Sequence, residues 1–291
     1  MDNIKKAVIP IAGLGTRFLP LSKAVPKELL SLVDKPAIQY IIEEVKKSGI
    51  NDIIFVIRPK GKEVFNYFQK FPKLEKILKE RKKENFLEEV KKLTEISKNT
   101  SFSWAVQKEP LGDGHAILQV KKFIGKDPFV VLFPDDIIDS KIPCVAQIEQ
   151  VFKTCQKPVI ALKKIPKEEL HRYGVVKVEK IANRIYKIKK IVEKPGPGEE
   201  PSDLAIIGRY VHTPDIFQYL GKVSPSKRGE IYISEVLEKM LSDGKIIYGY
   251  EFEGERLDCG DKLGWLKSNF YLSLKHPKFG PELKKFLKDI T

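Results

Sequence analysis

The sequence predicts an α/β fold with a mixed, mostly parallel central sheet flanked by helices. Runs rich in Val and Ile, the composition of strands buried on both faces, recur along the chain. Amphipathic stretches with helical spacing separate these runs, and strands that alternate with helices in this way pair in parallel through crossover helices. With 291 residues, the chain is long enough for one large domain or two closely packed ones, with a sizeable core.

The elements are predicted in the following order. Residues 7–12 form the first buried strand, and further buried strands follow at 53–57, 129–133 and 159–162. Between the first two strands, residues 37–48 carry apolar side chains at helical spacing and end before Gly49, which is a natural helix stop. These segments make up the predicted parallel part of the sheet.

Four other segments complete the prediction. Residues 73–98 are charged and periodic, which indicates one or two surface helices, and residues 174–191 alternate as in antiparallel strands added at an edge. Residues 195–198, Pro-Gly-Pro-Gly, indicate a loop. The tail, residues 263–291, is predicted to be helical and to pack on the main domain, residues 1–262, or on another subunit.

Composition excludes several classes of protein. Hydrophobic residues make up 42% and charged residues 32%, as in folded globular proteins. No run approaches the roughly 20 apolar residues that cross a bilayer, and the N-terminus lacks the apolar core of a signal peptide, so we expect a cytoplasmic protein. The three cysteines, Cys144, Cys155 and Cys259, match neither a zinc pattern nor a disulfide framework.

The formal net charge of +14 is compatible with two kinds of partner. A basic protein binds nucleic acid or an anionic membrane, or it handles phosphorylated small molecules. Acidic residues interrupt the lysines in runs such as 78–84, a pattern typical of solvated helix faces. Charge by itself therefore does not decide between the two.

A glycine-rich segment, Ala12-Gly13-Leu14-Gly15-Thr16-Arg17, directly follows the first predicted strand. Glycines let the backbone approach a ligand, and exposed N–H groups there can bind phosphate oxygens. The dinucleotide fingerprint would need a third glycine at position 18, which is Phe18, and the Gly-Lys-Ser/Thr end of the ATPase phosphate loop is missing. A tight strand-to-helix turn would explain these glycines equally well.

Cations next to this segment favour a phosphate site. Arg17 and Lys27 flank residues 18–26, where Pro20 and Pro26 oppose a regular helix, so we expect an ordered loop. Arginine offers a planar fork to phosphate oxygens, and lysine offers a point charge. Cations beside a glycine turn at the end of a first strand indicate a triphosphate site.

The run over residues 7–36, AVIPIAGLGTRFLPLSKAVPKELLSLVDKP, resembles the signature of the sugar nucleotide pyrophosphorylases. Later motifs fit that family in the right order, so the resemblance covers nearly the whole chain. It implies a Rossmann-like nucleotidyltransferase fold, in which Ala12, Gly13 and Gly15 bind the nucleotide, and Arg17 and Lys27 hold its phosphates. The implied reaction transfers a uridylyl group from UTP to α-D-glucose 1-phosphate, forming UDP-glucose and pyrophosphate.

Two acidic positions are candidate metal ligands. Asp135 and Asp136 follow the predicted strand at 129–133, and acids at the carboxyl end of a parallel strand lie where such sheets bind ligands. Alone, an Asp in this place is often a helix cap or turn residue. Mg²⁺ prefers oxygen ligands and takes one or two carboxylates, with phosphates and water completing its shell. By the resemblance, Asp135 and Asp258 bind Mg²⁺ and Asp136 faces the sugar.

The segment 107–116 resembles the part of the family that covers the nucleobase, which assigns Gln107 and Gly112 to the base. An amide donates and accepts at once, which suits the imide edge of uracil, although thymine shares that edge. Asp113 stands where related uridylyltransferases commonly have leucine. His115 is expected to be structural, because no partner motif accompanies it.

The resemblance assigns the sugar site to two later motifs. Gly174, in Tyr-Gly-Val-Val, offers its backbone to the hexose. In Val-Glu-Lys-Pro, Glu193 accepts hydrogen bonds from sugar hydroxyls and Lys194 neutralises the sugar phosphate. The segment 229–235 also resembles the family but departs from it at Tyr232, Ser234 and Glu235, so it receives no role.

In the implied mechanism, the sugar phosphate attacks the α-phosphorus of UTP in line, with Arg17, Lys27 and Lys194 as the catalytic cations. A phosphomonoester, with a second pKa of about 6, needs no general base. We expect a homodimer or homotetramer, with the tail as a candidate interface.

Three alternatives remain. One is a thymidylyltransferase or another enzyme of the same family, although the insert at 73–98 and the motif at 258–260 favour uridylyl transfer. Another is a regulatory protein without turnover, although the loop cations and the acids are retained. The third is a nucleic-acid binder, although the chain has no recognisable RNA or DNA motif.

Overall fold

The computed structural model describes residues 4–225 and 229–290. Its centre is a nine-stranded sheet, whose strands are, in spatial order, β5 (Ser101–Val106), β4 (Asp52–Ile57), β1 (Lys6–Pro10), β6 (Phe129–Leu132), β11 (Leu204–His212), β8 (Val159–Lys164), β12 (Tyr248–Glu251), β10 (Ile185–Glu193) and β9 (Gly174–Ala182). Strands β5, β4, β1 and β6 are parallel, β11 runs against both of its neighbours, and β12 is again parallel to β8. The predicted mixed α/β sheet is confirmed.

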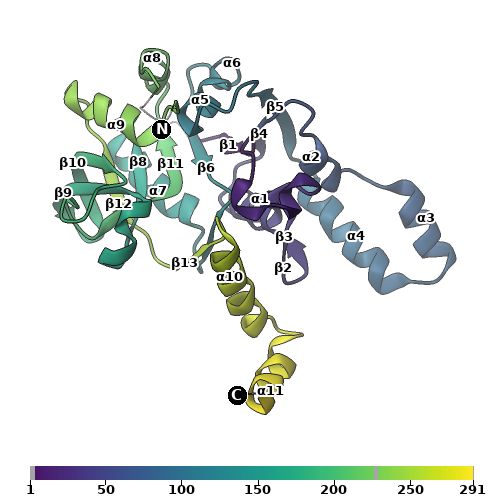
Figure 1. Cartoon of the computed structure of the whole chain (residues 1–291). Coiled ribbons are helices and arrows are strands. Elements are labelled where there is room, and N and C mark those ends of the chain that lie inside the picture. The colour runs from purple at the N-terminus through teal and green to yellow at the C-terminus, as the bar shows by residue number, and fades with distance from the viewer. Residues whose placement is uncertain (1–3, 226–228, 291) are drawn as a thin grey trace.

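Helices cover both faces of the sheet (Figure 1). On one face lie α1 (Ala37–Lys47) and α7 (Cys144–Cys155); on the other lie α5 (Asp113–Leu118), α6 (Lys121–Ile124), α8 (Ile216–Leu220) and α9 (Ile233–Ser242). Successive residues of β1 alternate between the two cores, with Ala7 and Ile9 in the first and Val8 in the second. Burial on both faces explains why these strands appear in the sequence as continuous apolar runs.

Every strand and helix predicted for the parallel part is present. The strands expected at 7–12, 53–57, 129–133 and 159–162 are β1, β4, β6 and β8, and the helix expected at 37–48 is α1. Strand β11 was not predicted, although all of its 9 residues are buried. Gly208, Arg209 and His212 interrupt its apolar run, which obscures the strand signal.

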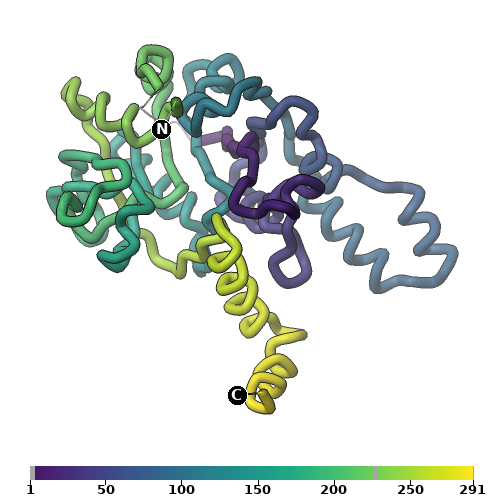
Figure 2. Tube along the Cα trace, viewed as in Figure 1, coloured from purple at the N-terminus to yellow at the C-terminus, as the bar shows by residue number. Residues whose placement is uncertain are grey.

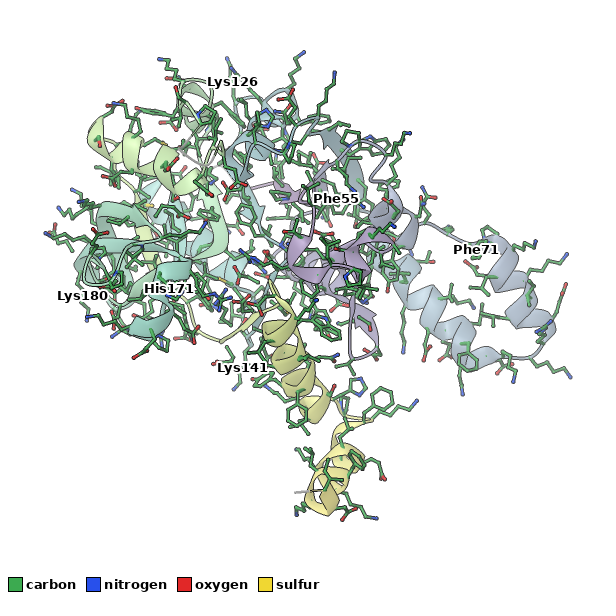
Figure 3. All side chains as sticks on the ribbon, viewed as in Figure 1. Phe55, Phe71, Lys126, Lys141, His171 and Lys180 are labelled. Carbon is green, nitrogen blue, oxygen red and sulfur yellow. The ribbon has the colours of Figure 1, made fainter. Side chains whose placement is uncertain are left out.

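The charged insert forms two helices, α3 (Pro72–Glu80) and α4 (Glu84–Ser97), neither of which has a buried residue. Both project from the body of the fold after the short helix α2 (Glu63–Tyr67), as Figure 1 shows. Figure 3 labels Phe71 at the start of this projection and Phe55 within the body; Phe71 is 58% exposed, whereas Phe55 is 1% exposed. The prediction of surface helices is confirmed.

The predicted antiparallel addition is the hairpin of β9 and β10. Strand β9 also pairs with β11 at one position, so the hairpin bends back toward the middle of the sheet. Residues 195–198 lie outside helices and strands, as expected.

Two further small sheets and the tail complete the fold. Strand β2 (Ser31–Leu32) pairs with β3 (Lys35–Pro36), and β7 (Asp136–Asp139) pairs with β13 (Glu255–Asp258). The tail forms α10 (Lys262–Lys275), which contacts β13 and β2, and α11 (Gly280–Ile290), which contacts α10 and extends away from the sheet (Figure 2). Over the described ranges, no helix is long and apolar enough to span a bilayer.

Candidate active site

The loop after β1 contains three short 3-10 turns, Thr16–Phe18, Leu21–Lys23 and Lys27–Leu29, and no α-helix. This confirms the expectation of an ordered loop that carries Arg17 and Lys27. Gly15 has a φ of 66°, and a Cβ there would lie 3.1 Å from Cβ of Ser22, so the tight fold of the loop requires a glycine.

A cavity of about 450 Å³ opens beside this loop. It gathers residues from far apart in the sequence, most of them predicted for the nucleotide: Ala12, Gly13, Arg17, Lys27, Gln107, Gly112, Asp135 and Lys194. Gly15 lines a smaller neighbouring cleft instead. Because β1 and β6 are parallel, the loops after their carboxyl ends meet at one edge of the sheet, which is where such sheets bind ligands.

The amide of Gln107 is held in place by the protein. Its Nε2 donates to the Gly112 carbonyl over 3.0 Å and lies 3.1 Å from Nδ1 of His115, whose Nε2 lies 3.0 Å from Nε2 of Gln119. The bond to the Gly112 carbonyl fixes the orientation of the amide, and Oε1 is the atom that can accept from a ligand. His115 positions Gln107, a role that fits the expected structural one.

The two candidate metal ligands lie close together. The β7–β13 pairing puts Asp258 opposite Asp136, and the backbone N–H of Cys259 donates to the Asp135 carbonyl over 2.7 Å. A Cβ on Gly260 would lie 3.0 Å from Oδ1 of Asp258 and 3.7 Å from Oδ2 of Asp135, so this glycine keeps the space beside both carboxylates open.

The donor set fits a hard divalent cation. Within the described part of the chain, no three His, Cys, Asp or Glu residues gather to hold a metal. Two carboxylates beside a phosphate site suit Mg²⁺, which takes its remaining ligands from phosphates and water.

Lys27 and Asp135 form an ion pair, with 2.9 Å between Nζ and Oδ2. Burial alone would lower the pKa of Lys27, but Asp135 and Glu28 outweigh it, so that pKa is raised. Burial alone would raise the pKa of Asp135, but the Lys27 ammonium holds it below its usual value. Both groups are therefore charged at neutral pH.

A second cavity, of about 330 Å³, adjoins the first. Arg17, Asp135 and Lys194 line both cavities, so these three residues lie between the two spaces. The other residues that line the second cavity are Asp136, Arg172, Tyr173, Arg256, Asp258 and Gly260. Gly174 and Glu193, predicted for the sugar, line neither cavity, but their chain neighbours Tyr173 and Lys194 do.

Arg256 is a site residue that the sequence reasoning missed. Its Nε donates to Oδ1 of Asp136 over 2.6 Å, and its Nη1 donates to the Tyr173 hydroxyl over 2.9 Å. Asp136 also accepts from the Gly208 N–H over 3.1 Å, so a sugar hydroxyl would share this carboxylate with the protein. Arg256 lies two residues before Asp258, hence on the same face of β13, and a prediction of that strand would have indicated it.

Glu193 and Gly174 lie opposite each other in the β9–β10 hairpin. A Cβ on Gly174 would lie 3.2 Å from Oε2 of Glu193, so glycine leaves room for this carboxylate. Ser234 Oγ donates to Oε2 over 2.7 Å, and Oε1 lies 3.3 Å from Nζ of Lys194. The Glu193 carboxylate, which the sequence predicts for the sugar, is thus held by Ser234 on one oxygen and by Lys194 on the other.

Lys194 follows β10 with a φ of 47°, in the left-handed region that a lysine rarely adopts. Its backbone N–H donates to the Tyr173 carbonyl over 2.9 Å, and its Nζ lies 4.5 Å from the centre of the Tyr232 ring. A residue held in a strained conformation by its surroundings is typical of functional sites.

Arg209 fixes the loop that carries the acidic residues. It is fully buried in β11 and pairs with Glu44, with 2.8 Å between Nη2 and Oε2. Its Nη1 donates to the Phe133 carbonyl over 3.1 Å, and its Nη2 donates to the Asp136 carbonyl over 2.8 Å. In the sequence, this role could have been indicated by Arg209, which stands alone as a charged residue in the apolar run of β11.

Comparisons with known proteins show what this chain resembles. The chain matches the family model of the nucleotidyl transferases over residues 6–269. It is 43% identical over 290 residues to a UTP–glucose-1-phosphate uridylyltransferase of Staphylococcus haemolyticus, with 100% of this chain and 99% of that protein aligned. UTP-bound UGPase from Acinetobacter baumannii superposes with a TM-score of 0.90 at 36% identity, over 99% of this chain and 100% of that one. A UDP-glucose pyrophosphorylase complexed with UDP-glucose superposes with a TM-score of 0.84 at 36% identity, over 94% of this chain and 100% of that one.

Proposed function

The chain belongs to the nucleotidyl transferase family, and we propose that it transfers the uridylyl group of UTP to α-D-glucose 1-phosphate, forming UDP-glucose and pyrophosphate. The observation that carries this proposal is the border between the two cavities, which Arg17, Asp135 and Lys194 share. Two cations at the junction of two spaces suit the transfer of a charged group from one ligand to another.

In the proposed reaction, a phosphate oxygen of glucose 1-phosphate forms a bond to the α-phosphorus of UTP. The bond from that phosphorus to the oxygen of the β-phosphate breaks, and its electron pair leaves with pyrophosphate. Both reactants are polyanions, so catalysis depends on positioning and charge neutralisation. Lys194 guides the attacking phosphate, and Arg17 and Lys27 hold the departing pyrophosphate.

The nucleotide occupies the larger cavity in this proposal. The backbone around Ala12, Gly13 and Gly15 approaches the base and the phosphates. Oε1 of Gln107 accepts from the imide N–H of uracil, because the amide Nε2 already donates to the Gly112 carbonyl.

The hexose occupies the second cavity in this proposal, and Asp136 accepts from its hydroxyls. Glu193 and Gly174 do not line that cavity, but they are the chain neighbours of its lining residues Lys194 and Tyr173, and we propose that they contact the bound hexose. Asp136 is oriented by Arg256 and Glu193 by Ser234. Carboxylates whose rotamers are locked by neighbours suit the recognition of a particular sugar.

We further propose that the divalent metal that such enzymes use is Mg²⁺, held by Asp135 and Asp258. When bound, it would neutralise charge on the phosphate oxygens near the α-phosphorus. Asp135→Asn should raise the Mg²⁺ concentration needed for half-maximal activity about tenfold, because one anionic ligand is lost. Asp139→Asn is the matched control, since Asp139 lies on β7 and bonds to Tyr271. A titration of Asp135→Asn that coincides with the parent's would reject this ligand.

Pyrophosphate release with each pairing of UTP, dTTP or ATP with glucose or galactose 1-phosphate tests the function. We expect UTP with glucose 1-phosphate to give the highest kcat/KM. Preference for dTTP would favour a thymidylyltransferase, and no release with any pair would favour a non-catalytic relative.

We also propose that the chain forms a homodimer or homotetramer through residues 263–291. Large apolar side chains lie exposed along α10 and α11, at Leu266, Phe270, Phe286 and Ile290. The mass in solution should fall when Phe286 and Ile290 are both changed to serine, and it should stay unchanged when the exposed Ile181 of β9 is changed instead. A parent that is a monomer would contradict the proposal.

A further inference from the structure

The segment that leads into α9, residues 231–234, lies between the nucleotide loop and the sugar carboxylate. We call it the α9 entry segment. The Ile231 N–H donates to the Leu111 carbonyl over 2.8 Å, and the Gly114 N–H donates to the Ile231 carbonyl over 2.9 Å. Backbone pairing thus joins the first residue of this segment to the loop that carries Gln107 and Gly112.

Asp113 adds a side-chain link to the same segment. Its Oδ1 accepts from the Gly114 N–H over 2.7 Å and from the Ile233 N–H over 2.9 Å. The first bond is a local turn within its own helix, whereas the second joins the start of α5 to the start of α9. A carboxylate is favoured at a helix N-terminus, where N–H groups lack partners within the helix.

The next residues of the entry segment contact the groups proposed for the acceptor. Ser234 Oγ donates to Glu193 over 2.7 Å, and the Tyr232 ring faces the Lys194 ammonium at 4.5 Å. Three consecutive residues therefore contact, in order, Lys194, Asp113 and Glu193. Asp113 is among the residues that line the nucleotide cavity. Its bond to Ile233 fixes the backbone between Tyr232 and Ser234, the two residues that contact Lys194 and Glu193.

The electrostatic surroundings show how close these groups are. Burial, with a further contribution from Glu193, raises the pKa of Asp113 to about 7, against the opposing Ile233 hydrogen bond and Lys194. The carboxyl group of Asp113 in turn helps to raise the pKa of Tyr210 on β11, after the larger effect of burial. Oδ1 can accept hydrogen bonds in either protonation state, so the link does not depend on ionisation.

We propose that Asp113 is a positioning residue for the acceptor sugar phosphate, acting through the α9 entry segment on Glu193 and Lys194. This rests on the function proposed above, because it concerns the acceptor half of the same site. Loss of the Oδ1 acceptor frees the Ile233 N–H and the turn that follows. The backbone pairs of Ile231 with Leu111 and Gly114 remain, so the nucleotide loop keeps its attachment.

Steady-state kinetics of two variants test this proposal. In Asp113→Asn the amide oxygen still accepts both hydrogen bonds, so the KM for glucose 1-phosphate should stay within about twofold of the parent's. In Asp113→Ala that KM should rise about tenfold, while the KM for UTP stays within about threefold. An equal rise of both KM values, or a fall in kcat alone, would overturn the positioning role.

A double variant tests whether Asp113 acts through Ser234. If it does, Asp113→Ala combined with Ser234→Ala should raise the acceptor KM no further than the stronger single change, because both remove the same constraint. Effects that multiply independently would show that Asp113 acts by another route. If Asp113→Ala does not fold, the other two variants still test the route. The KM for glucose 1-phosphate should be unchanged in Asp113→Asn and raised in Ser234→Ala.

Amide hydrogen exchange of the free protein keeps this test separate from the reaction. Asp113→Ala should increase exchange at Ile233 and Ser234 at least fivefold, and Asp113→Asn should not. Unchanged exchange in Asp113→Ala would refute the link itself, whatever the enzyme's substrate. Failure of the parent to release pyrophosphate would instead refute the proposed function and leave the exchange result standing.

Discussion

At the scale of single residues, Lys194 carries the most specific expectation. Its Nζ lies between the Glu193 carboxylate and the Tyr232 ring, on the border of both cavities. Lys194→Ala should lower kcat about 100-fold or more, because the charge that guides the attacking phosphate of glucose 1-phosphate is lost.

The control for Lys194→Ala is Lys190→Ala, since Lys190 is an exposed lysine on the same strand. It should leave kcat within about twofold of the parent's. Uridylyl transfer that survives intact in Lys194→Ala would remove this lysine from the mechanism.

Asp113 also predicts how stability depends on pH. Its pKa is raised from an ordinary 3.8 to about 7 in the folded chain, mainly by burial, so the folded state binds this proton more tightly than the unfolded state does. The contribution of Asp113 to stability is therefore fully present below pH 4 and is lost as pH rises to about 7. Asp113→Asn does not lose stability in this way. The difference between its Tm and the parent's Tm should therefore rise in favour of the variant from pH 4 to 7 and stay constant above pH 7.

Calorimetry from pH 4 to 8.5 on both proteins measures that difference. A Tm difference that is the same at every pH would mean that Asp113 titrates normally in the folded chain.

At the scale of elements, Gly112 shows why one loop needs a glycine. Its φ is 95°, and a Cβ there would lie 2.7 Å from the Ile231 carbonyl oxygen. Gly112→Ala should destabilise the fold by about 1–3 kcal/mol and raise the KM for UTP, because the loop must leave the α9 entry segment.

Gly198→Ala separates the two causes of that cost. Gly198 also has a positive φ, 84°, but a Cβ there would meet nothing within 4 Å. In urea unfolding, Gly198→Ala should lose less free energy of unfolding than Gly112→Ala. The difference between the two losses should equal the steric cost of the contact with Ile231. Equal losses would mean that the contact with Ile231 relaxes freely.

How deeply a strand is buried helps to decide whether the sequence reveals it. Strands β1, β4, β6 and β8 were predicted, because a strand buried on both faces is a run of apolar residues that needs no other context. Strands β7 and β13 are short and half-buried, so no such pattern marks them. The pairing of these two strands brings Asp135 and Asp136 close to Asp258. Because β13 was not predicted, the sequence did not indicate that Arg256 lies on the same face as Asp258.

At the scale of the whole molecule, one buried ion pair joins three parts of the fold. Arg209 of β11 binds Glu44 of α1 and two carbonyls of the loop that carries Asp135. Arg209→Met should cost about 3–5 kcal/mol in the free energy of unfolding, because it leaves the Glu44 carboxylate buried without its partner. It should also lower kcat, since the loop that carries the proposed metal ligand Asp135 loses its support.

Replacing both partners is the informative companion to that experiment. The double variant Arg209→Met, Glu44→Leu removes the unpaired charge and should recover at least part of the stability lost in Arg209→Met. Guanidinium unfolding measures both. A double variant that is less stable than the single one would show that Glu44 stabilises the fold independently of Arg209.

The sequence by itself determined the α/β class, the buried parallel strands, the surface insert, the helical tail and the residue types of the site. Those features depend on local periodicity and on motifs of a few residues, which can be recognised without knowing how the segments pack. The family resemblance already paired Asp135 with Asp258, whereas only the tertiary structure decided that Arg256 meets Asp136 and that Asp113 meets the start of α9. Such contacts join residues far apart along the chain, so strand register and helix packing set them, and no local pattern encodes either.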